Sequence, residues 1–374
     1  MAEKPFGKLK MLPIFEPSLN KNEIKKNLIN CIEKNWISSQ GSFVKKFEKK
    51  IAKLHNVKYA LAVSSCTSAL HLALVSLGLK KNDEVICPAL TFIAPANMII
   101  LSGFKINLVD INKETLNLDL IDLKKKINPN TKAIVVVHQF GHAADMDEII
   151  KLSKKYKIKI IEDNAESMGG YYKNKILGSI GDIATLSFFA NKIITTGEGG
   201  AILTNKKNIY KKCLMMRDHG MSIKKRYEHK MLGFNYRMTN LQAAVGISQI
   251  NDFNKIIKIR NKQMNLYYSL LKGNKNFELR QFANWCTPVH WLMTIILKKK
   301  EDKKRIIKYL KDYKIECRPM INPVNKAKQF NHINLYFKNA MFISERSIHL
   351  PSSTNLSDEE IKKISTKVIN FFNK

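Results

Sequence analysis

Short apolar runs alternate with amphipathic stretches along the first two thirds of the chain. The runs that predict buried strands cover residues 59–63, 105–109, 133–138, 158–162, 183–188 and 200–204, and helical patterns at 118–127 and 145–156 lie between several of them. Strands and helices that alternate at this spacing form crossover units. The pattern therefore predicts an α/β fold with a mostly parallel central sheet flanked by helices, in which ligands bind at the carboxyl ends of strands.

Two amphipathic helices are predicted before the first strand. Asn20, with Glu23 three residues later, predicts a capped helix that ends near residue 34. Ser42 is predicted to cap a second helix. The apolar face of that helix is formed by Phe43, Phe47, Ile51 and Leu54.

The pattern changes after residue 240. A long helical pattern runs from 240 to about 273, followed by predicted strands at 291–297 and 315–318 and helices at 303–313 and 357–372. Ser357 and Glu360 form a capping pair at the start of the last helix. We therefore expect a large domain, residues 1–255, and a smaller C-terminal α+β domain, residues 256–374.

The composition is that of a globular protein, because 45% of the 374 residues are hydrophobic and 25% are charged. Residues 85–104 carry no charge and have the length of a membrane span, but Pro88, Pro95, Asn97 and Gly103 interrupt them. A strand, a turn at Pro88 and a buried helix explain this stretch better. Since the first ten residues also hold no apolar signal segment, we expect a cytoplasmic protein that does not span a membrane.

Basic residues outnumber acidic ones by 64 to 31, which gives a formal net charge of +33. Such a charge is typical of nucleic-acid-binding proteins, which are the alternative class. However, only eight of the basic residues are Arg, the side chain that recognises phosphates and bases bidentately, and the lysines are spread along the whole chain. We therefore expect no nucleic-acid partner, and a positive field that favours anionic small molecules.

The six cysteines are widely spaced and form no C-x-x-C pair. This spacing favours free thiols in a reducing compartment over a zinc site or a redox pair. No pair of histidines has metal-ligand spacing that a third ligand would complete. We therefore expect no metal.

Lys192 is the first candidate catalytic residue. It follows the apolar run that ends at Phe189 and precedes Gly197, Gly199 and Gly200. A lysine delivered from a buried strand into a flexible turn is suited to form a Schiff base with a carbonyl group or with pyridoxal phosphate. The ordinary alternative is a solvated surface lysine.

Two acids, Glu162 and Asp163, end another apolar run, and Glu166 follows three residues later. Taken alone, these acids are equally consistent with an ordinary strand-end turn and helix cap and with a functional role. In the functional role, one carboxylate pairs with a buried cation such as a protonated pyridine nitrogen. Such a carboxylate keeps the cofactor ring protonated, so that the ring can act as an electron sink.

Ser65, Cys66 and Thr67 lie between a predicted strand and a predicted helix, where hydroxyls and free amides suit a phosphate. Phe92, just past Pro88, could stack on an aromatic cofactor. An N-cap and a core aromatic are the ordinary readings of these two features. In combination, the phosphate-type turn, the aromatic, the aspartate and the lysine each follow a strand of one sheet, and this order is much more specific than any single feature.

These segments together resemble the DegT/DnrJ/EryC1/StrS family of nucleotide-sugar aminotransferases, pyridoxal-phosphate enzymes of fold type I. The resemblance covers nearly the whole chain. Its most specific segments are Gly-Asp-Ile from residue 181, Asn-Lys-Ile-Ile-Thr-Thr-Gly-Glu-Gly-Gly from residue 191, and Gly-Phe-Asn-Tyr-Arg-Met-Thr-Asn from residue 233. It implies pyridoxal 5′-phosphate, alternating with its pyridoxamine form, as the cofactor, and L-glutamate and a nucleotide-sugar as substrates.

The resemblance also implies roles for individual residues. Lys192 would form the Schiff base with the cofactor and later move protons to the sugar. Asp163 would pair with the pyridine nitrogen, and Phe92 would stack on the ring. Glu166, where many relatives have Gln, would lie near the ring and its phenolic oxygen.

The remaining implied contacts concern the cofactor phosphate. Ser65, Cys66, Thr67 and Ser187 would bind it, with Cys66 acting through its backbone amide because many relatives have Gly there. Asn235 would reach the phosphate from the neighbouring subunit, so that the resemblance implies a homodimer with shared active sites.

Within the family, residues 14–20, 36–41 and 220–227 are similar to those of enzymes that aminate C4 of GDP-4-keto-6-deoxy-mannose, with glutamate as the donor, for polysaccharide synthesis. Related dehydratases carry His at the position of Lys192, which favours amination here. Another UDP-, dTDP- or GDP-linked 4-keto sugar, or a dehydration, is the alternative. The sequence assigns no role to His138, His219, Glu198 or Arg226.

Overall fold

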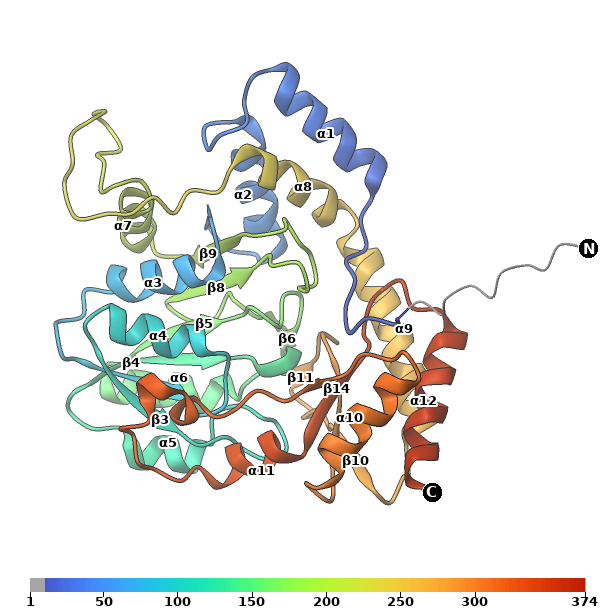
Figure 1. The fold of residues 1–374 in the computed structure, drawn as a ribbon. Helices are drawn as coiled ribbons and strands as arrows, with labels where there is room; N and C mark the ends of the chain where they lie inside the picture. Colours follow the sequence, from blue (N-terminus) through green and yellow to red (C-terminus); the bar gives the residue numbers. More distant parts are fainter. Residues whose placement is uncertain (1–10, 374) are drawn as a thin grey trace, which may run out of the picture.

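A computed structural model describes residues 11–373, with a seven-stranded sheet at its centre (Figure 1). The strand order is β1-β9-β8-β5-β4-β2-β3. The strands are β1 (Tyr59–Val63), β2 (Glu84–Pro88), β3 (Lys105–Val109), β4 (Thr131–Val137), β5 (Lys159–Asp163), β8 (Ile183–Ser187) and β9 (Gly200–Thr204). Strand β9 runs antiparallel to its neighbours β1 and β8, and the other neighbouring pairs are parallel. The predicted mostly parallel sheet is confirmed, and β1, β2, β5 and β8 all end at the same edge.

Helices cover both faces of this sheet because its strands are apolar on both sides. In β4, Ala133, Val135 and Val137 belong to one core, and Ile134 and Val136 belong to the other. The first core contains residues of α2, α3, α4 and α8, and the second contains residues of α5 and α6. The helices of this part are α1 (Lys21–Glu33), α2 (Ser42–Leu54), α3 (Cys66–Ser76), α4 (Ile93–Leu101), α5 (Leu120–Lys126), α6 (Met146–Tyr156), α7 (Lys207–Arg217) and α8 (Asn240–Asn251).

A second sheet and its helices form a separate core in the C-terminal part. Its strands are β10 (Phe277–Leu279), β12 (Met293–Leu297), β14 (Ser347–Leu350) and β13 (Arg318–Pro319), in this spatial order. The helices of this part are α9 (Phe253–Leu271), α10 (Asp302–Asp312), α11 (Lys338–Arg346) and α12 (Asp358–Phe372). A small third sheet joins β11 (Cys286–Thr287), β6 (Tyr171–Tyr172) and β7 (Lys175–Ile176).

Single-turn helices complete the element list: η1 (Gln139–Gly141), η2 (Val324–Lys326) and η3 (Lys328–Phe330). The division at residue 255 stays a prediction, and it falls in the first turn of α9. Two segments cross between the parts. Leu12 bridges Ile315, and α11 returns to the large sheet, where the Asn339 N–H donates to Asp110 Oδ2 at 3.0 Å.

Three local predictions differ from the structure. Ser42 is the first residue of α2, not its cap, because Asn240 Oδ1 from α8 accepts the Phe43 N–H at 2.9 Å. The predicted single helix over 240–273 is two helices, α8 and α9, separated at Asp252. The predicted strand at 315–318 is reduced to β13, since Ile315 pairs with Leu12 instead.

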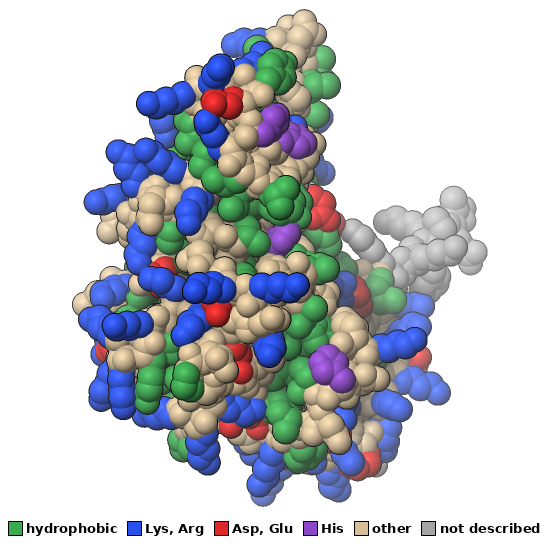
Figure 2. All heavy atoms as spheres, turned by 90° about the vertical axis from the view of Figure 1, so that its left-hand side faces the viewer, with side chains coloured by type: hydrophobic (Ala, Val, Ile, Leu, Met, Phe, Trp, Pro, Cys, Tyr) green, Lys and Arg blue, Asp and Glu red, His purple; other side chains and the backbone are tan. Residues whose placement is uncertain are grey.

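The uncharged stretch from 85 to 104 forms most of β2, a turn and the helix α4, so the predicted order of strand, turn and helix is confirmed. The turn follows Pro88, which is the last residue of β2, and α4 is buried except at its C-terminal end, where Leu101 is exposed. Among residues 11–373, none of the helices combines the length and the apolar character needed to cross a membrane. Figure 2 shows Lys and Arg side chains spread from top to bottom over one face, among hydrophobic and uncharged groups.

Candidate active site

A cavity of about 430 Å³ lies where the parallel strands of the central sheet end. Eight of the nine predicted site residues line it: Ser65, Cys66, Thr67, Phe92, Asp163, Glu166, Ser187 and Lys192. They come from segments up to 127 positions apart in the chain, and the sheet brings them together because β1, β2, β5 and β8 end at one edge. The predicted grouping of these eight residues is therefore what the structure shows.

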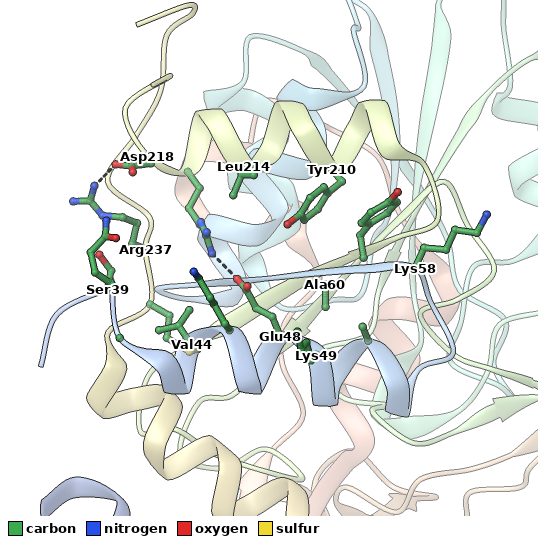
Figure 3. Close-up of a pocket in the computed structure, with 17 residues that line it drawn as sticks. Ser39, Val44, Glu48, Lys49, Lys58, Ala60, Tyr210, Leu214, Asp218 and Arg237 are labelled. Carbon is green, nitrogen blue, oxygen red and sulfur yellow. Dashed lines mark hydrogen bonds and ion pairs between the residues drawn. The ribbon is translucent and has the colours of Figure 1, made fainter. Parts of the chain in front are cut away.

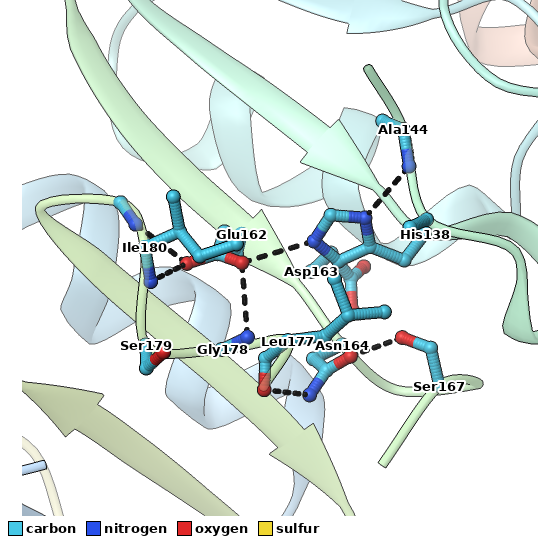
Figure 4. Close-up of polar contacts among 12 residues, drawn as sticks. His138, Ala144, Glu162, Asp163, Asn164, Ser167, Leu177, Gly178, Ser179 and Ile180 are labelled. Carbon is cyan, nitrogen blue, oxygen red and sulfur yellow. Dashed lines mark hydrogen bonds and ion pairs between the residues drawn. The ribbon is translucent and has the colours of Figure 1, made fainter. Parts of the chain in front are cut away.

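The two acids at the end of β5 point in opposite directions, as neighbours in a strand must. Glu162 is fully buried, does not line the cavity, and points toward Gly178 and Ile180 (Figure 4). It accepts hydrogen bonds from His138 Nε2 at 3.0 Å and from the backbone N–H groups of Gly178, Ile180 and Gly181 at 2.9, 2.7 and 2.6 Å. Burial opposes its ionisation, but these donors outweigh burial and hold the pKa of Glu162 below its usual value. Glu162 therefore fixes the end of β5 to the 178–181 loop.

Asp163 lines the cavity and is only 4% exposed. Its Oδ1 accepts from the Ala165 N–H at 3.1 Å and from Thr185 Oγ1 at 3.5 Å. Burial raises the pKa of Asp163, which means that the ionised form lacks enough partners of its own. A cation placed in the cavity would stabilise that carboxylate.

Lys192 reaches into the cavity from the turn after β8. Its Nζ lies 3.8 Å from the ring centre of Trp291 and 3.9 Å from Glu166 Oε1. Trp291 is itself fixed, because its Nε1 donates to Asn191 O at 2.6 Å and its ring stacks on Phe140 at 5.9 Å between centres. The amine thus lies beside an aromatic face and a carboxylate, which position it in the cavity.

The start of α3 forms another wall of the cavity. Ser65 is the N-cap, and its side chain accepts from the Ser68 N–H at 3.1 Å. The N–H groups of Cys66 and Thr67 have no acceptors within the helix, as at any helix start. Gly200 of β9 makes this arrangement possible, since a Cβ there would lie 2.5 Å from the carbonyl carbon and oxygen of Ser65. Both readings of this turn hold: it is an N-cap, and it presents free amides to the cavity.

These residues fit pyridoxal phosphate. The free amides of α3 and the Ser187 hydroxyl suit its phosphate, and the unsatisfied Asp163 carboxylate suits a protonated ring nitrogen. Lys192 lies in the same cavity as the amine that would hold the aldehyde carbon. The cavity volume also suits a small cofactor with part of a substrate. Burial raises the pKa of the Cys66 thiol, so its side chain is neutral and its backbone amide is the group that would suit a phosphate.

Two predicted residues lie at the periphery. Phe92 precedes α4 at the rim of the cavity, and 60% of its surface is exposed. Asn235 does not line the cavity of its own chain. It belongs to the 218–239 segment, which projects from the body between α7 and α8 (Figure 1). Its predicted contact with the phosphate of a neighbouring subunit stays a prediction.

The residues without an assigned role divide clearly. His138 and His142 are fully buried and bonded within the protein, the first to Glu162 and the second to the Ala143 carbonyl at 2.7 Å. His219 occupies an exposed turn with φ of 57°. Glu198 lines the cavity, whereas Arg226 does not.

Trp291, Arg318 and His349 are among the cavity residues that the sequence did not predict. They come from the C-terminal part, more than 90 residues after Lys192, and no local motif marks them. Arg318 is half-exposed beside Glu316, at 3.3 Å. Burial lowers the pKa of His349 to about 3, so that its ring is neutral.

A second cavity of about 450 Å³ lies between α2, β1 and α7 (Figure 3). Two ion pairs line it: Arg217 Nη1 contacts Glu48 Oε1 at 2.7 Å, and Arg237 pairs with Asp218. Glu48 and Arg217 also bond the N–H and the carbonyl of Ala62, the free edge of β1. We interpret these side chains as cover for an edge strand rather than as a reactive centre. In the part of the chain that is described, no cluster of His, Cys, Asp and Glu has the arrangement of a metal site.

Comparison with known proteins points to one family. The model of the DegT/DnrJ/EryC1/StrS aminotransferase family matches residues 18–369. GDP-perosamine synthase of Escherichia coli O157:H7 is 37% identical over 364 residues, which cover 97% of this chain and 99% of that protein.

Solved structures agree with this match. Helicobacter pylori PseC, an aminotransferase involved in the biosynthesis of pseudoaminic acid, superposes with a TM-score of 0.93 at 29% identity, over 97% of this chain and all of PseC. A mutant of the GDP-4-keto-6-deoxymannose-3-dehydratase ColD, with bound GDP-perosamine, gives a TM-score of 0.89 at 26% identity, over 96% of this chain and all of ColD. The fold type I architecture predicted from the sequence is confirmed.

Proposed function

We propose that this chain, which belongs to the DegT/DnrJ/EryC1/StrS aminotransferase family, moves an amino group from L-glutamate to C4 of GDP-4-keto-6-deoxy-mannose and so makes GDP-perosamine. The observation that carries the proposal is the cavity shared by Lys192, Asp163 and the start of α3. The Escherichia coli relative is named GDP-perosamine synthase and aligns over nearly the full length of both chains, which supports this substrate over other 4-keto sugars.

Pyridoxal phosphate, the cofactor of this family, supplies an aldehyde that exchanges amines and a ring that takes up electrons. Asp163 would hold the ring nitrogen, and Phe92 would cover one ring face. Ser65, Cys66, Thr67 and Ser187 would hold the phosphate. Lys192 would hold the cofactor between turnovers and, when free, carry protons on Nζ to and from the reacting carbon.

The surroundings of Lys192 suit a proton carrier. Nζ lies against the ring of Trp291, which stacks on Phe140, and Glu166 Oε1 lies 3.9 Å from Nζ. An amine held in this place lies in the same cavity as the reacting carbon would, which is what proton transfer requires. Lys192 also distinguishes this site from the dehydratase alternative, in which the sequence resemblance places His.

We propose further that the active unit is a homodimer. The 218–239 segment carries Asn235 away from its own cavity, and Ile223, Tyr227 and Leu232 on it are 52%, 73% and 91% exposed. Burial of these side chains against a second copy would favour association. Sedimentation should show a dimer, and a monomer at micromolar concentration would contradict this part of the proposal.

The absorption spectrum with pyridoxal phosphate tests the site. The wild-type protein should show a near-ultraviolet or visible band of lysine-bound cofactor, and L-glutamate should shift it. Lys192→Ala should lack the covalent link, which borohydride reduction and peptide mass determination can locate in the wild type. Linkage at another lysine, or no band at all, would overturn the proposed role of Lys192.

A further inference from the structure

Arg280 is a buried cation outside the cavity. It follows β10, is 4% exposed, and within residues 11–373 has no carboxylate at ion-pair distance. Its guanidinium instead donates to three carbonyl oxygens: Nη1 to Phe140 O at 3.0 Å, and Nη2 to Gln139 O and to Thr115 O, both at 2.7 Å. Burial lowers its pKa to about 10, so it remains charged at neutral pH. A buried charge without a counter-ion is costly, and this one needs an explanation.

Two of the three carbonyls, those of Gln139 and Phe140, belong to a strained turn at the cavity wall. Phe140 has a φ of 50°, which is uncommon for a non-glycine residue, and Gly141 follows with a φ of 82°. No side chain fits at Gly141, since a Cβ would lie 1.7 Å from Val289 O. The turn therefore has one orientation, and Arg280 fixes it from behind.

One peptide group of this turn links the cation to the cavity. The carbonyl of Gln139 accepts from Arg280, and the N–H of the same peptide group, on Phe140, donates to Glu166 Oε2 at 2.9 Å. The other oxygen, Glu166 Oε1, lies 3.9 Å from Lys192 Nζ. The order in space is guanidinium, peptide, carboxylate, amine, with the peptide dipole aligned to favour negative charge on Glu166.

We propose that Arg280 is a positioning residue: through the peptide that joins Gln139 to Phe140, it favours the ionised form of Glu166 and aims that carboxylate at Lys192. The inference rests on the proposed function, in which Lys192 is the reactive amine. The chemical purpose of Arg280 follows from the changes of charge that Lys192 undergoes during a reaction cycle. Whenever the amine is neutral, Glu166 loses its nearest cation, while Arg280 keeps its charge throughout.

The other charged and titratable groups around Glu166 act in both directions. Burial raises the pKa of Glu166, and Asp163 at the end of β5 raises it further. Lys192, the Phe140 N–H and Arg280 lower it. The Cys66 thiol at the start of α3 also senses the Glu166 charge, and it stays neutral because burial raises its pKa. Replacing Arg280 leaves all the other groups in place.

The test is an infrared titration of the full-length protein, with and without pyridoxal phosphate. The carbonyl band of protonated Glu166 is identified by its absence in Glu166→Gln, and its midpoint is followed against pH. In Arg280→Met, which removes the charge, the midpoint should rise by about one pH unit. Arg280→Lys keeps a charge but not the three-way fork, and it should shift the midpoint much less.

The result that would overturn the inference is a midpoint in Arg280→Met equal to that of the wild type, or an equal shift in Arg280→Lys. The titration without cofactor separates this inference from the proposed function. Failure to bind pyridoxal phosphate would refute the latter alone, since the midpoints can be compared without it.

A double variant covers the case in which Arg280→Met is too unstable to titrate. Removing Glu166 as well should restore stability at pH 8, because the buried carboxylate no longer needs compensation. Arg280→Met/Glu166→Gln should therefore unfold at a higher temperature than Arg280→Met. His142, His290 and His349 also sense Arg280, but they are present in both variants. No recovery in the double variant would overturn the inference, because Arg280 would then act only on the turn.

Discussion

Replacing Glu162 by Gln should destabilise the protein although the two side chains have the same shape. Oε1 accepts the N–H groups of Ile180 and Gly181, and Oε2 accepts His138 Nε2 and the Gly178 N–H (Figure 4). Gln keeps one oxygen, so two of these donors lose their acceptor and face an NH₂ group instead. A hydrogen bond to a charged group contributes about 1.5–3 kcal/mol, which predicts a loss of about 3–6 kcal/mol. Domains unfold with only about 5–15 kcal/mol, so the loss is large.

The assay is urea unfolding at pH 7, followed by circular dichroism. Glu278→Gln is the matched control, because Glu278 is exposed on β10 and its replacement should change stability by less than about 0.5 kcal/mol. Cofactor affinity should fall together with stability in Glu162→Gln, since Asp163 follows Glu162 directly on β5. A loss below about 1 kcal/mol would refute the reasoning, because the carboxylate would then not be the group that holds the 178–181 loop.

Three further predictions concern the cavity and the core. Gly200→Ala should weaken binding of pyridoxal phosphate in an equilibrium titration. The added Cβ would lie 2.5 Å from the carbonyl carbon of Ser65 and would therefore displace the start of α3. Unchanged affinity would contradict the role of that helix start. Pyridoxal phosphate should quench tryptophan fluorescence, and Trp291→Phe should lose most of this quenching while Trp285→Phe keeps it, since only the first lines the cavity. Burial lowers the pKa of several histidines in the folded protein, so below pH 6.5 the unfolded chain binds more protons than the folded one. The stability present above that pH is therefore lost as the pH falls, by about 1.4 kcal/mol per pH unit for each histidine. The histidines concerned are His55, His142, His290 and His349, whose pKa values are about 4, 3, 4 and 3. Urea unfolding should show lower stability at about pH 5.5 than at pH 6.5, and equal stability at the two pH values would contradict this prediction.

The central sheet could be predicted because each strand has a short apolar run at its centre and is bounded by polar turns. For β1, β3 and β9, the predicted and observed bounds coincide. The same pattern placed the ends of four strands at one edge, and so most of the cavity residues. Capping was less predictable where a partner from elsewhere intervenes: Asn240 of α8 accepts the Phe43 N–H, and α2 begins one residue earlier than a Ser42 cap would allow.

The missing part of the site comes from tertiary structure alone. Period-two alternation requires Glu162 and Asp163 to face opposite ways, but it does not say which one faces the cavity; the contacts of Glu162 with 178–181 decide that. Trp291 and Arg280 reach the site from the C-terminal part, where their sequence neighbours predict only a strand or no element. Their roles depend on contacts with Asn191 and with the 139–141 turn, and these contacts leave no trace in local periodicity.

Transfer of labelled nitrogen tests the central claim most directly. The purified protein is incubated with pyridoxal phosphate, GDP-4-keto-6-deoxy-mannose and glutamate that carries heavy nitrogen, beside Lys192→Ala. The account predicts a GDP-linked 4-amino sugar that contains the heavy nitrogen, formed by the wild type and not by the variant. A product that has lost oxygen without gaining nitrogen, or equal labelling by Lys192→Ala, would contradict it.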